Sequence, residues 1–416
     1  MKIYLVGGAV RDQLLNLPIK DRDWVVVGAT KEILLKKKFQ QVGKDFPVFL
    51  HPKTREEYAL ARKDRKLGKG HTNFHTDFSS YITLEEDLIR RDLTINAIAQ
   101  DKNGNYIDPY QGKKDLEHRL LRHISTSFTE DPLRVLRTAR FAAQLMHLGF
   151  RVATETMFLM REIVKKKELL YLTINRVWSE TEKAFKTKNP HVYFQVLYSC
   201  GALNLIFPEI YFLYQQELFF TNYLNYLNNF FLSKGLSKIS TLTEDISIRF
   251  SYIFQFFSLN TNNIFKKKFY DQISASIVQN FCNRLNIPTN IKEIAILSAG
   301  FYNFLNSIKY QSSKNIVHFF CKIDAWRKPD RIKKFLFLSN FNFLHNTSQN
   351  YILNDYSDIN LSPGLFLQKS FYIVRDISIK SILKKGFTGN QIKNELNRIR
   401  IKKLDLWRIK NVKKLF

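Results

Sequence analysis

The chain has 416 residues and carries 65 Lys and Arg against 37 Asp and Glu, a formal net charge of +28. This length predicts two or more packed units, and the charge favours a polyanionic partner such as nucleic acid, although drift toward Lys, Asn, Ile and Phe would give the same excess. The three cysteines, Cys200, Cys282 and Cys321, lie far apart, which argues against a disulfide framework or a zinc site and is typical of a reducing cytoplasm.

Residues 1–120 alternate short β-rich runs with helical stretches and Gly or Asp turns, which predicts a small mixed α/β unit. The predicted strands cover residues 2–6, 24–27 and 58–61. The apolar start is too short for a signal-peptide core, and later apolar stretches are interrupted well short of a membrane span of ~20 residues. We therefore expect a cytoplasmic protein that does not cross a membrane.

Gly7 and Gly8 end the first predicted strand and precede a predicted helix. Glycine lets backbone amides approach a triphosphate closely, at a helix N-terminus that attracts anions. Arg11 would then lie one helical turn in. An ordinary strand-to-helix turn is the alternative, but the position ahead of paired carboxylates favours phosphate binding.

Asp21 and Asp23 lie two residues apart at the start of the second predicted strand. On a strand both carboxylates project from the same side and can share hard cations. Two Mg²⁺ ions held ~4 Å apart would activate an attacking hydroxyl and neutralise a leaving pyrophosphate. A charged turn is the alternative reading. A third carboxylate is expected on a neighbouring strand, where strand alternation alone does not choose between Glu56 and Glu57.

Arg90, Arg91 and Asp92 precede an apolar pattern over residues 93–98 that predicts a helix start, where Asp92 would act as a cap. Two arginines beside a carboxylate also match a triphosphate-and-ribose clamp, with guanidinium on phosphate and carboxylate on hydroxyl. We favour the clamp.

From Pro132 onward the pattern becomes helical, and Asp131 before Pro132 is typical of a helix cap. Arg134 lies on the same helical face as Asp131, and a carboxylate acceptor beside a guanidinium donor can read the edge of a cytosine or adenine. Arg137 and Arg140 continue at three-residue intervals as phosphate contacts or as a solvated basic stripe. We favour contacts.

Beyond about residue 205 the chain remains helical in pattern without a recognisable chemical motif. Residues 380–416 carry 12 Lys or Arg, with Glu395 and Asp405 as the acids. This pattern indicates either a solvated basic helix or a contact with an RNA backbone.

In order along the chain, these motifs resemble the bacterial CCA-adding enzymes, the class II tRNA nucleotidyltransferases of the polymerase-β-like superfamily, through about residue 210. The resemblance is carried by Gly7 to Asp12, Asp21 to Asp23, Arg90 to Ala97, Asp108-Pro109 with Gly112 and Asp115-Leu116, Glu130 to Arg134, and Arg176 to Glu180. It implies an α+β fold with a nucleotidyltransferase head (residues 1–120), a helical neck that selects the nucleotide (121–205), and a helical, tRNA-binding body and tail (206–416).

The resemblance also implies roles for individual residues. Asp21 and Asp23 would bind Mg²⁺, Asp92 would read the ribose, and Asp131 and Arg134 would pair with C or A. The remaining nucleotide-holding residues would be Gly8, Arg11, Arg91, Arg137 and Arg140. The implied reaction adds or repairs the 3′-terminal CCA of tRNA without a nucleic-acid template, from CTP and ATP with release of pyrophosphate. No obligatory protein partner is evident.

Longer relatives carry an HD phosphohydrolase domain built from clustered His and Asp, but residues 248–257, where such a pair is expected, contain neither. We therefore expect no phosphohydrolase activity and a degenerate HD region. Poly(A) polymerases share the head motifs but tend to carry a basic run after the second strand. Here residues 42–50 include Asp45, which favours CCA addition. A catalytically silent RNA-binding protein is the third hypothesis, and intact Asp21, Asp23 and Arg91 argue against it.

Overall fold

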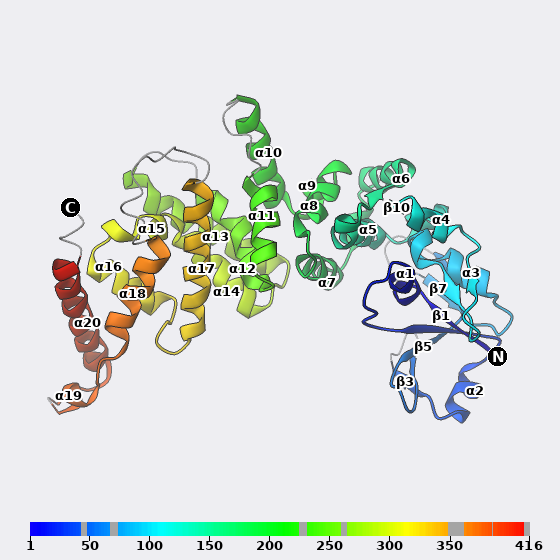
Figure 1. The fold of residues 1–416 in the computed structure, drawn as a ribbon, viewed down its shortest axis with the longest axis horizontal. Coiled ribbons are helices and arrows are strands. Elements are labelled where there is room, and N and C mark those ends of the chain that lie inside the picture. The colour runs from blue at the N-terminus through cyan, green and yellow to red at the C-terminus, as the bar shows by residue number, and fades with distance from the viewer. Residues whose placement is uncertain are drawn as a thin grey trace. The chain divides into compact units, whose positions relative to one another are not determined.

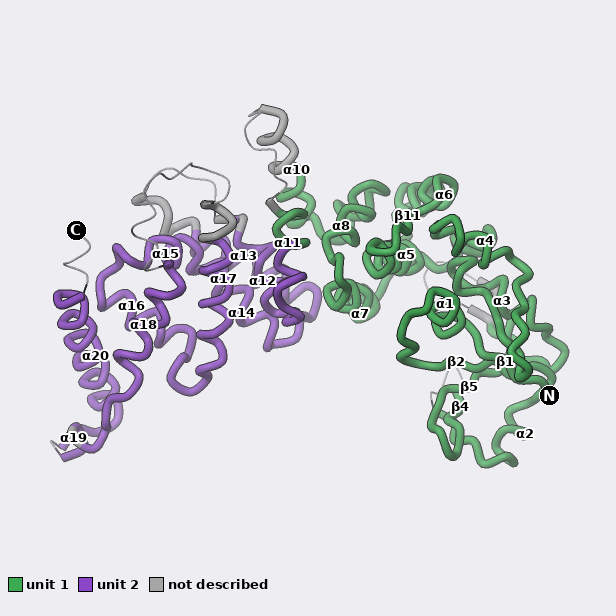
Figure 2. The backbone as a smooth tube through the Cα atoms, in the orientation of Figure 1, with its two compact units in different colours: residues 1–237 green, residues 238–416 purple. Residues whose placement is uncertain are grey.

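The structure, a computed structural model, describes residues 1–42, 48–66, 74–223, 231–258, 264–347, 362–384 and 386–411. The chain divides into two compact units, Met1–Ser237 and Lys238–Phe416 (Figure 2). The first contains the sheet and the second is helical, so the predicted α+β class is confirmed. Asp45, on which the distinction from poly(A) polymerases partly depended, lies outside the described residues.

A mixed seven-stranded sheet forms the start of the first unit, with strand order β3-β4-β5-β2-β1-β8-β9. β1 pairs antiparallel with β2 and β8, whereas β2 and β5 are parallel. Two further pairs, β6 with β7 and β10 with β11, lie outside this sheet. The strands are β1 (Lys2–Val6), β2 (Asp23–Val27), β3 (Gln40–Val42), β4 (Val48–Leu50), β5 (Glu57–Leu60), β6 (Lys63–Lys66), β7 (Phe74–Asp77), β8 (Ala99–Gln100), β9 (Tyr106–Ile107), β10 (Leu120–Leu121) and β11 (Arg151–Val152).

Side-chain alternation along β2 divides the core between the two faces of the sheet. Val25 packs with Leu84 and Leu88 of α3 (Leu84–Ile89). Val26 packs in a separate cluster with Leu34 of α2 (Lys31–Lys36). Helices α3 and α2 therefore cover opposite faces (Figure 1). The odd-numbered positions of β2, including Asp23, belong to the α3 face.

Helices make up the rest of the first unit, and α5 is buried along most of its length against α7 and α8. The predicted helix over residues 93–98 is wrong: a single 3₁₀ turn, η1, leads directly into β8. The helices are α1 (Gly8–Leu14), α4 (Gly112–Glu117), α5 (Leu133–Leu145), α6 (Thr154–Lys165), α7 (Ile174–Phe185), α8 (Pro190–Ser199), α9 (Ala202–Ile206) and α10 (Pro208–Tyr223), with 3₁₀ turns η1 (Thr94–Asn96), η2 (Thr126–Glu130), η3 (Met146–Leu148) and η4 (Glu168–Tyr171). Helix α11 (Phe231–Leu242) spans the boundary between the two units.

The second unit is a helical array around an aromatic core that includes Phe319, Phe320 and Phe335, each fully buried. None of the helices in the described ranges is long and apolar enough to cross a membrane. The helices are α12 (Ile246–Phe254), α13 (Ile264–Arg284), α14 (Thr289–Gly300), α15 (Tyr302–Asn306), α16 (Ser313–Lys322), α17 (Pro329–Thr347), α18 (Pro363–Arg375), α19 (Lys380–Leu383) and α20 (Gly389–Asn411), with 3₁₀ turns η5 (Gln255–Ser258) and η6 (Ile308–Tyr310).

Candidate active site

The parallel pairing of β2 with β5 distinguishes the two candidate third carboxylates. Asp23 is the register partner of Glu57, so both side chains belong to the same face of the sheet. Glu56 belongs to the other face, where its Oε2 accepts a hydrogen bond from Trp24 Nε1 at 3.0 Å and its Oε1 lies 3.5 Å from Arg22 Nη1. The sheet therefore places Glu57, and not Glu56, beside Asp23.

Asp21 lies two residues before β2 begins, so strand alternation does not place it as we expected. Asp21 is nevertheless close enough to Asp23 to repel its carboxylate. Although exposed, Asp23 is partly desolvated, which raises its pKa; Arg91 opposes this rise and Asp21 adds to it. Within the described ranges, no three His, Cys, Asp or Glu side chains are assembled closely enough to hold a metal ion, so Asp21, Asp23 and Glu57 are not a preformed triad.

The diglycine turn brings Arg91 against the backbone at the end of β1. Gly7 has a φ of +74°, and a Cβ at this position would lie 3.1 Å from Arg91 Nη1. A larger residue would be strained there and would displace the guanidinium. Gly8 opens α1, and the Arg11 N–H donates to the Gly7 carbonyl, so Arg11 lies one turn into the helix as predicted. Fully buried Asp87 accepts from Arg91 Nη2 at 3.2 Å and also from Arg90.

A chain of charged groups continues from α1 to α5. Arg11, itself buried, donates from Nε to Asp12 Oδ1 (2.8 Å) and from Nη1 to Asn96 Oδ1 (2.9 Å). Asn96 donates to Asp92 Oδ1 (3.0 Å), and Arg137 Nε donates to Asp92 Oδ2 (2.7 Å). Burial alone would raise the pKa of Asp92, but the charge of Arg137 and the hydrogen bonds hold it well below its usual range. Asp92 is thus a buried, ionised acceptor.

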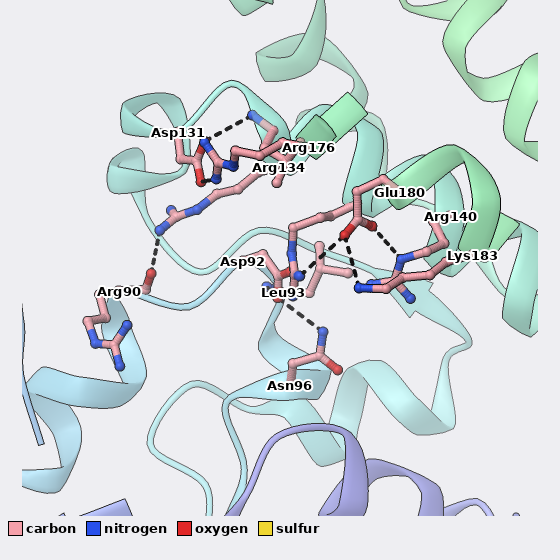
Figure 3. Close-up of polar contacts among 12 residues, drawn as sticks. Arg90, Asp92, Leu93, Asn96, Asp131, Arg134, Arg140, Arg176, Glu180 and Lys183 are labelled. Atoms are coloured by element: carbon pink, nitrogen blue, oxygen red, sulfur yellow. Dashed lines mark hydrogen bonds and ion pairs between the residues drawn. The ribbon is translucent and has the colours of Figure 1, made fainter. Parts of the chain in front are cut away.

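Glu180 of α7 orients the next arginine along α5 (Figure 3). Its Oε2 accepts from Arg140 Nε at 2.5 Å, and its Oε1 lies 3.8 Å from both Arg137 Nη1 and Lys183 Nζ. Glu180 is 3% exposed. The guanidinium of Arg140 lies 4.0 Å from the centre of the Phe141 ring, and those of Arg11 and Arg137 lie 5.2 and 5.6 Å from it. The alternative of a solvated basic stripe does not describe these arginines.

The Arg134 N–H donates to the Asp131 carbonyl at 3.0 Å, but the two side chains take different partners. Asp131 Oδ1 accepts the Leu133 N–H (3.1 Å) at the start of α5, and Oδ2 accepts Arg176 Nη2 (2.8 Å). Arg134 donates from Nη1 to the Ser127 carbonyl (2.8 Å) and from Nη2 to the carbonyl of Arg90. The predicted helix cap is displaced by one residue, because α5 begins at Leu133 and Pro132 is its N-cap. The side-chain partner of Asp131, Arg176, is a residue that the sequence left without a role.

The motif over residues 108–116 forms the start of α4 and contacts the turn η1. Both Asp108 carboxylate oxygens accept backbone N–H groups at the start of α4, from Gly112 (2.7 Å) and Lys113 (2.8 Å). A Cβ on Gly112 would lie 2.3 Å from the Thr94 carbonyl oxygen. Asp115 accepts from the Thr94 hydroxyl at 2.7 Å. These contacts pack α4 against η1, the turn that follows Asp92.

The sequence predicts no function for Asn96, Arg176 or Glu180, although all three lie within its motifs. Glu180 had a detectable signal: it lies three residues after Val177 and four before Ala184, on the buried face of its own helix. An acidic side chain at such a position needs a partner. No comparable signal in the sequence identifies which partner it takes.

Two protein families match separate parts of the first unit. Residues 3–122 match the poly A polymerase head domain family, and residues 149–213 match a family described as the probable RNA and SrmB-binding site of polymerase A. A CCA-adding enzyme of Buchnera aphidicola from Schizaphis graminum is 66% identical over 99% of this chain and 98% of its own length. The chain belongs to the CCA-adding enzymes. A second such enzyme, from Buchnera aphidicola subsp. Acyrthosiphon pisum strain Tuc7, is 62% identical over the full length of both chains.

The fold agrees with this family. A solved CCA-adding enzyme in an apo form superposes with a TM-score of 0.63 at 22% identity, covering 97% of this chain and 88% of its own. The head family alone does not separate CCA addition from poly(A) synthesis, because both activities share it. The full-length relatives do, so the predicted CCA-adding activity is confirmed and neither alternative is favoured.

Proposed function

We propose that this CCA-adding enzyme builds or repairs the 3′ end of tRNA from CTP and ATP, with side chains of residues 121–205 acting as the template. Solved CCA-adding enzymes of the same fold are described in complex with tRNA, with ATP and with CTP. We extend the same proposal to the domain division given above, to Mg²⁺ as the divalent ion, and to a cytoplasmic location, which suits three free cysteines.

The observation that carries the proposal is a half-buried carboxylate, Asp131, which lies just before α5, with one guanidinium group on that helix and another on α7. Cytosine and adenine both present an amino donor beside a ring-nitrogen acceptor, whereas guanine and uracil present a carbonyl beside a ring N–H. A carboxylate acceptor next to a guanidinium donor therefore matches C and A and opposes G and U. Arg134 and Asp131 supply these groups.

The carboxylates on the α3 face of the sheet fit a divalent cation. Asp23 and Glu57 are register partners, and the neighbouring charge of Asp21 raises the proton affinity of Asp23. Carboxylate oxygens completed by substrate phosphates are the usual ligands of Mg²⁺. Asp21 and Asp23 would hold the ion, with Glu57 as the third carboxylate. When bound, Mg²⁺ makes the attacking hydroxyl more acidic and neutralises the leaving pyrophosphate.

The remaining residues orient the nucleotide. Gly8 and Arg91 lie at the turn after β1 and would hold the triphosphate. Asp92, buried and ionised, would accept a hydrogen bond from a ribose hydroxyl. Arg11, Arg137 and Arg140 would supply positive charge, each already oriented by a carboxylate or amide oxygen. Pre-orientation of this kind lowers the entropic cost of binding.

The test is to incubate the purified protein and Mg²⁺ with a tRNA that lacks its last three nucleotides, supplying labelled CTP, ATP or both. Addition of C, C and one A followed by arrest supports the proposal. A long A tail without CTP would instead indicate poly(A) synthesis. Retained tRNA binding without extension would indicate a silent RNA-binding relative.

A further inference from the structure

We propose that Asp87 is a positioning residue for nucleotidyl transfer: it holds the Arg91 guanidinium toward the triphosphate and away from Asp23. This role depends on the proposed function, in which Arg91 contacts the triphosphate and Asp23 binds Mg²⁺. Asp87 lies in α3, three residues before Arg90, and belongs to none of the motifs that the sequence singled out.

The Asp87 carboxylate is buried at a point where several donors converge. It is 0% exposed. Its Oδ1 accepts from Arg90 Nη2 at 2.6 Å and from the Arg62 N–H at 3.3 Å, and its Oδ2 accepts from Arg91 Nη2 at 3.2 Å. Burial alone would raise the pKa of Asp87, but the charges of Arg90 and Arg91 hold it below its usual range. The carboxylate is therefore ionised and fixes the two arginines that follow α3.

The guanidinium of Arg91 is fixed on one side and faces the diglycine turn on another. Nη2 donates to Asp87, while Nη1 would lie 3.1 Å from a Cβ placed on Gly7. The side chain of Arg91 is 19% exposed. A guanidinium has five N–H donors, so the bond to Asp87 leaves others for the oxygens of a phosphate at this turn.

Asp23 is a second carboxylate within range of the Arg91 charge. Partial desolvation raises the pKa of Asp23, and the charge of Arg91 opposes that rise. A guanidinium that Asp87 did not hold could turn toward Asp23, where it would neutralise a proposed metal ligand and leave the triphosphate. Asp87 thus keeps Arg91 available to the phosphates and Asp23 available to the cation.

Charge and orientation predict opposite effects when Asp87 is replaced. Asp87→Asn keeps the size of the side chain and removes a negative charge. If net charge alone governed binding, the more positive site should bind a triphosphate more tightly. If Asp87 acts by orienting Arg91, the triphosphate should bind more weakly. The direction of the change therefore separates the two explanations.

The experiment measures the dissociation constants of CTP and CMP for the full-length protein, with Mg²⁺ and without tRNA, so that no transfer occurs. It compares the wild type with Asp87→Asn, Asp87→Glu and the control Glu86→Gln. Glu86 precedes Asp87 in α3 and pairs with Lys63 at 3.2 Å, and glutamine can still complete its capping box with Thr83.

We expect Asp87→Asn to lower the affinity for CTP relative to CMP by about 10-fold, the worth of one charge-assisted hydrogen bond. Asp87→Glu should lose a smaller part of this ratio, because it keeps the charge but moves it by one methylene group. Glu86→Gln should keep the whole ratio. If Asp87→Asn does not fold, Asp87→Glu takes its place, and an unchanged ratio in that variant would overturn the proposal.

Equal losses of CTP and CMP affinity in Asp87→Asn would show that Asp87 only braces the fold, and a higher relative affinity for CTP would show that only its charge matters. Either result would overturn the proposal. In an Arg91→Gln background, Asp87→Asn should change the ratio little, whereas fully additive losses would contradict an action through Arg91. Failure of the wild type to add C, C and A to a shortened tRNA would refute the proposed function instead.

Discussion

Two glutamates that are adjacent in the sequence, Glu56 and Glu57, have different surroundings in the structure. Glu57 faces the same side of the sheet as Asp23, whereas Glu56 is held on the other side by Trp24 and Arg22. Because successive strand residues project to opposite faces, neighbours with the same chemistry have different surroundings. Glu56 is therefore a natural control for substitutions of the proposed metal ligands.

Replacing Asp21 or Asp23 by Ala should abolish nucleotide transfer while leaving tRNA binding largely intact, because phosphate contacts elsewhere supply the affinity. Glu57→Gln should also slow transfer, and Glu56→Gln should remain close to the wild type because the amide still accepts from Trp24. Single-turnover C addition and filter binding of tRNA measure the two properties. Normal turnover of either aspartate variant would refute the metal assignment.

We expect Asp92 to contribute to the stability of the fold as well as to its proposed contact with the ribose. Asp92→Asn should lower the free energy of unfolding at pH 7 by about 1.5–3 kcal/mol, the cost of losing a charged partner from a hydrogen-bonded pair. The native pKa of Asp92 is depressed below an unfolded value near 3.9. The stabilisation is therefore complete above that value and declines as the pH falls toward the native pKa.

Urea unfolding at several pH values checks this dependence. The difference between the wild type and Asp92→Asn should be constant from pH 7 to pH 5 and should narrow between pH 5 and pH 3. A difference that stays the same at pH 3 would mean that the Asp92 carboxylate is not preferentially stabilised in the folded protein.

At the scale of elements, the sequence predicted periodic segments well and irregular ones poorly. The strand over residues 2–6 is observed as expected, because a short β-rich run before two glycines has few alternatives. The residues from Leu93 to Ile98 are all buried, and all except Thr94 and Asn96 are apolar. They nevertheless form a single 3₁₀ turn that leads into a strand. Contacts from distant residues hold this turn: Asp115 of α4 accepts from the Thr94 hydroxyl, and the Arg122 carbonyl accepts from the Thr94 N–H.

The same limit applies to the candidate site. The motifs identified Asp131, Arg137 and Arg140 as charged residues on one helix. Which partner each takes depends on how α7 packs against α5, and Arg176 and Glu180 are at least 40 residues away in sequence. Long-range ion pairs of this kind leave no spacing pattern in a single sequence. Their assignment required the packed structure.

Helix α20 near the C-terminus carries two kinds of basic residue: some contact the rest of the second unit, and others are exposed to solvent. Arg400 lies 3.5 Å from the centre of the Trp326 ring, and Arg408 donates to the carbonyls of Lys309 and Gln311. Lys402 and Lys403 are exposed on the same helix. The arginines of this segment therefore stabilise the fold, whereas its exposed lysines can contact a ligand.

If the exposed lysines contact an RNA backbone, Lys402→Gln and Lys403→Gln should each reduce the slope of log affinity for tRNA against log salt by about one. Unfolding in urea should not change. Arg400→Gln should instead destabilise the protein by ~1–2 kcal/mol through loss of its contact with Trp326. If a variant that combines both lysine substitutions keeps the wild-type salt slope, these lysines are merely solvated and do not contact the RNA.

At the scale of the whole molecule, the two units have separate cores and separate fluorescent reporters. Trp24 and Trp178 belong to residues 1–237, and Trp326 and Trp407 belong to residues 238–416. All proposed nucleotide contacts lie in the first unit. A ligand that binds only the folded first unit should stabilise that unit by mass action.

CTP should therefore raise the urea midpoint reported by the first pair of tryptophans and leave that of the second pair unchanged. At a concentration of 100 times Kd the stabilisation should be about 2.7 kcal/mol. The fluorescence of each pair is measured in a variant whose other two tryptophans are replaced by Phe. As a control, the urea midpoints of these variants without CTP are first compared with that of the wild type. UTP, whose base edge opposes Asp131, should shift the first midpoint less than CTP. If CTP moves both transitions equally, the two units unfold as one cooperative structure, because independent units share no such linkage.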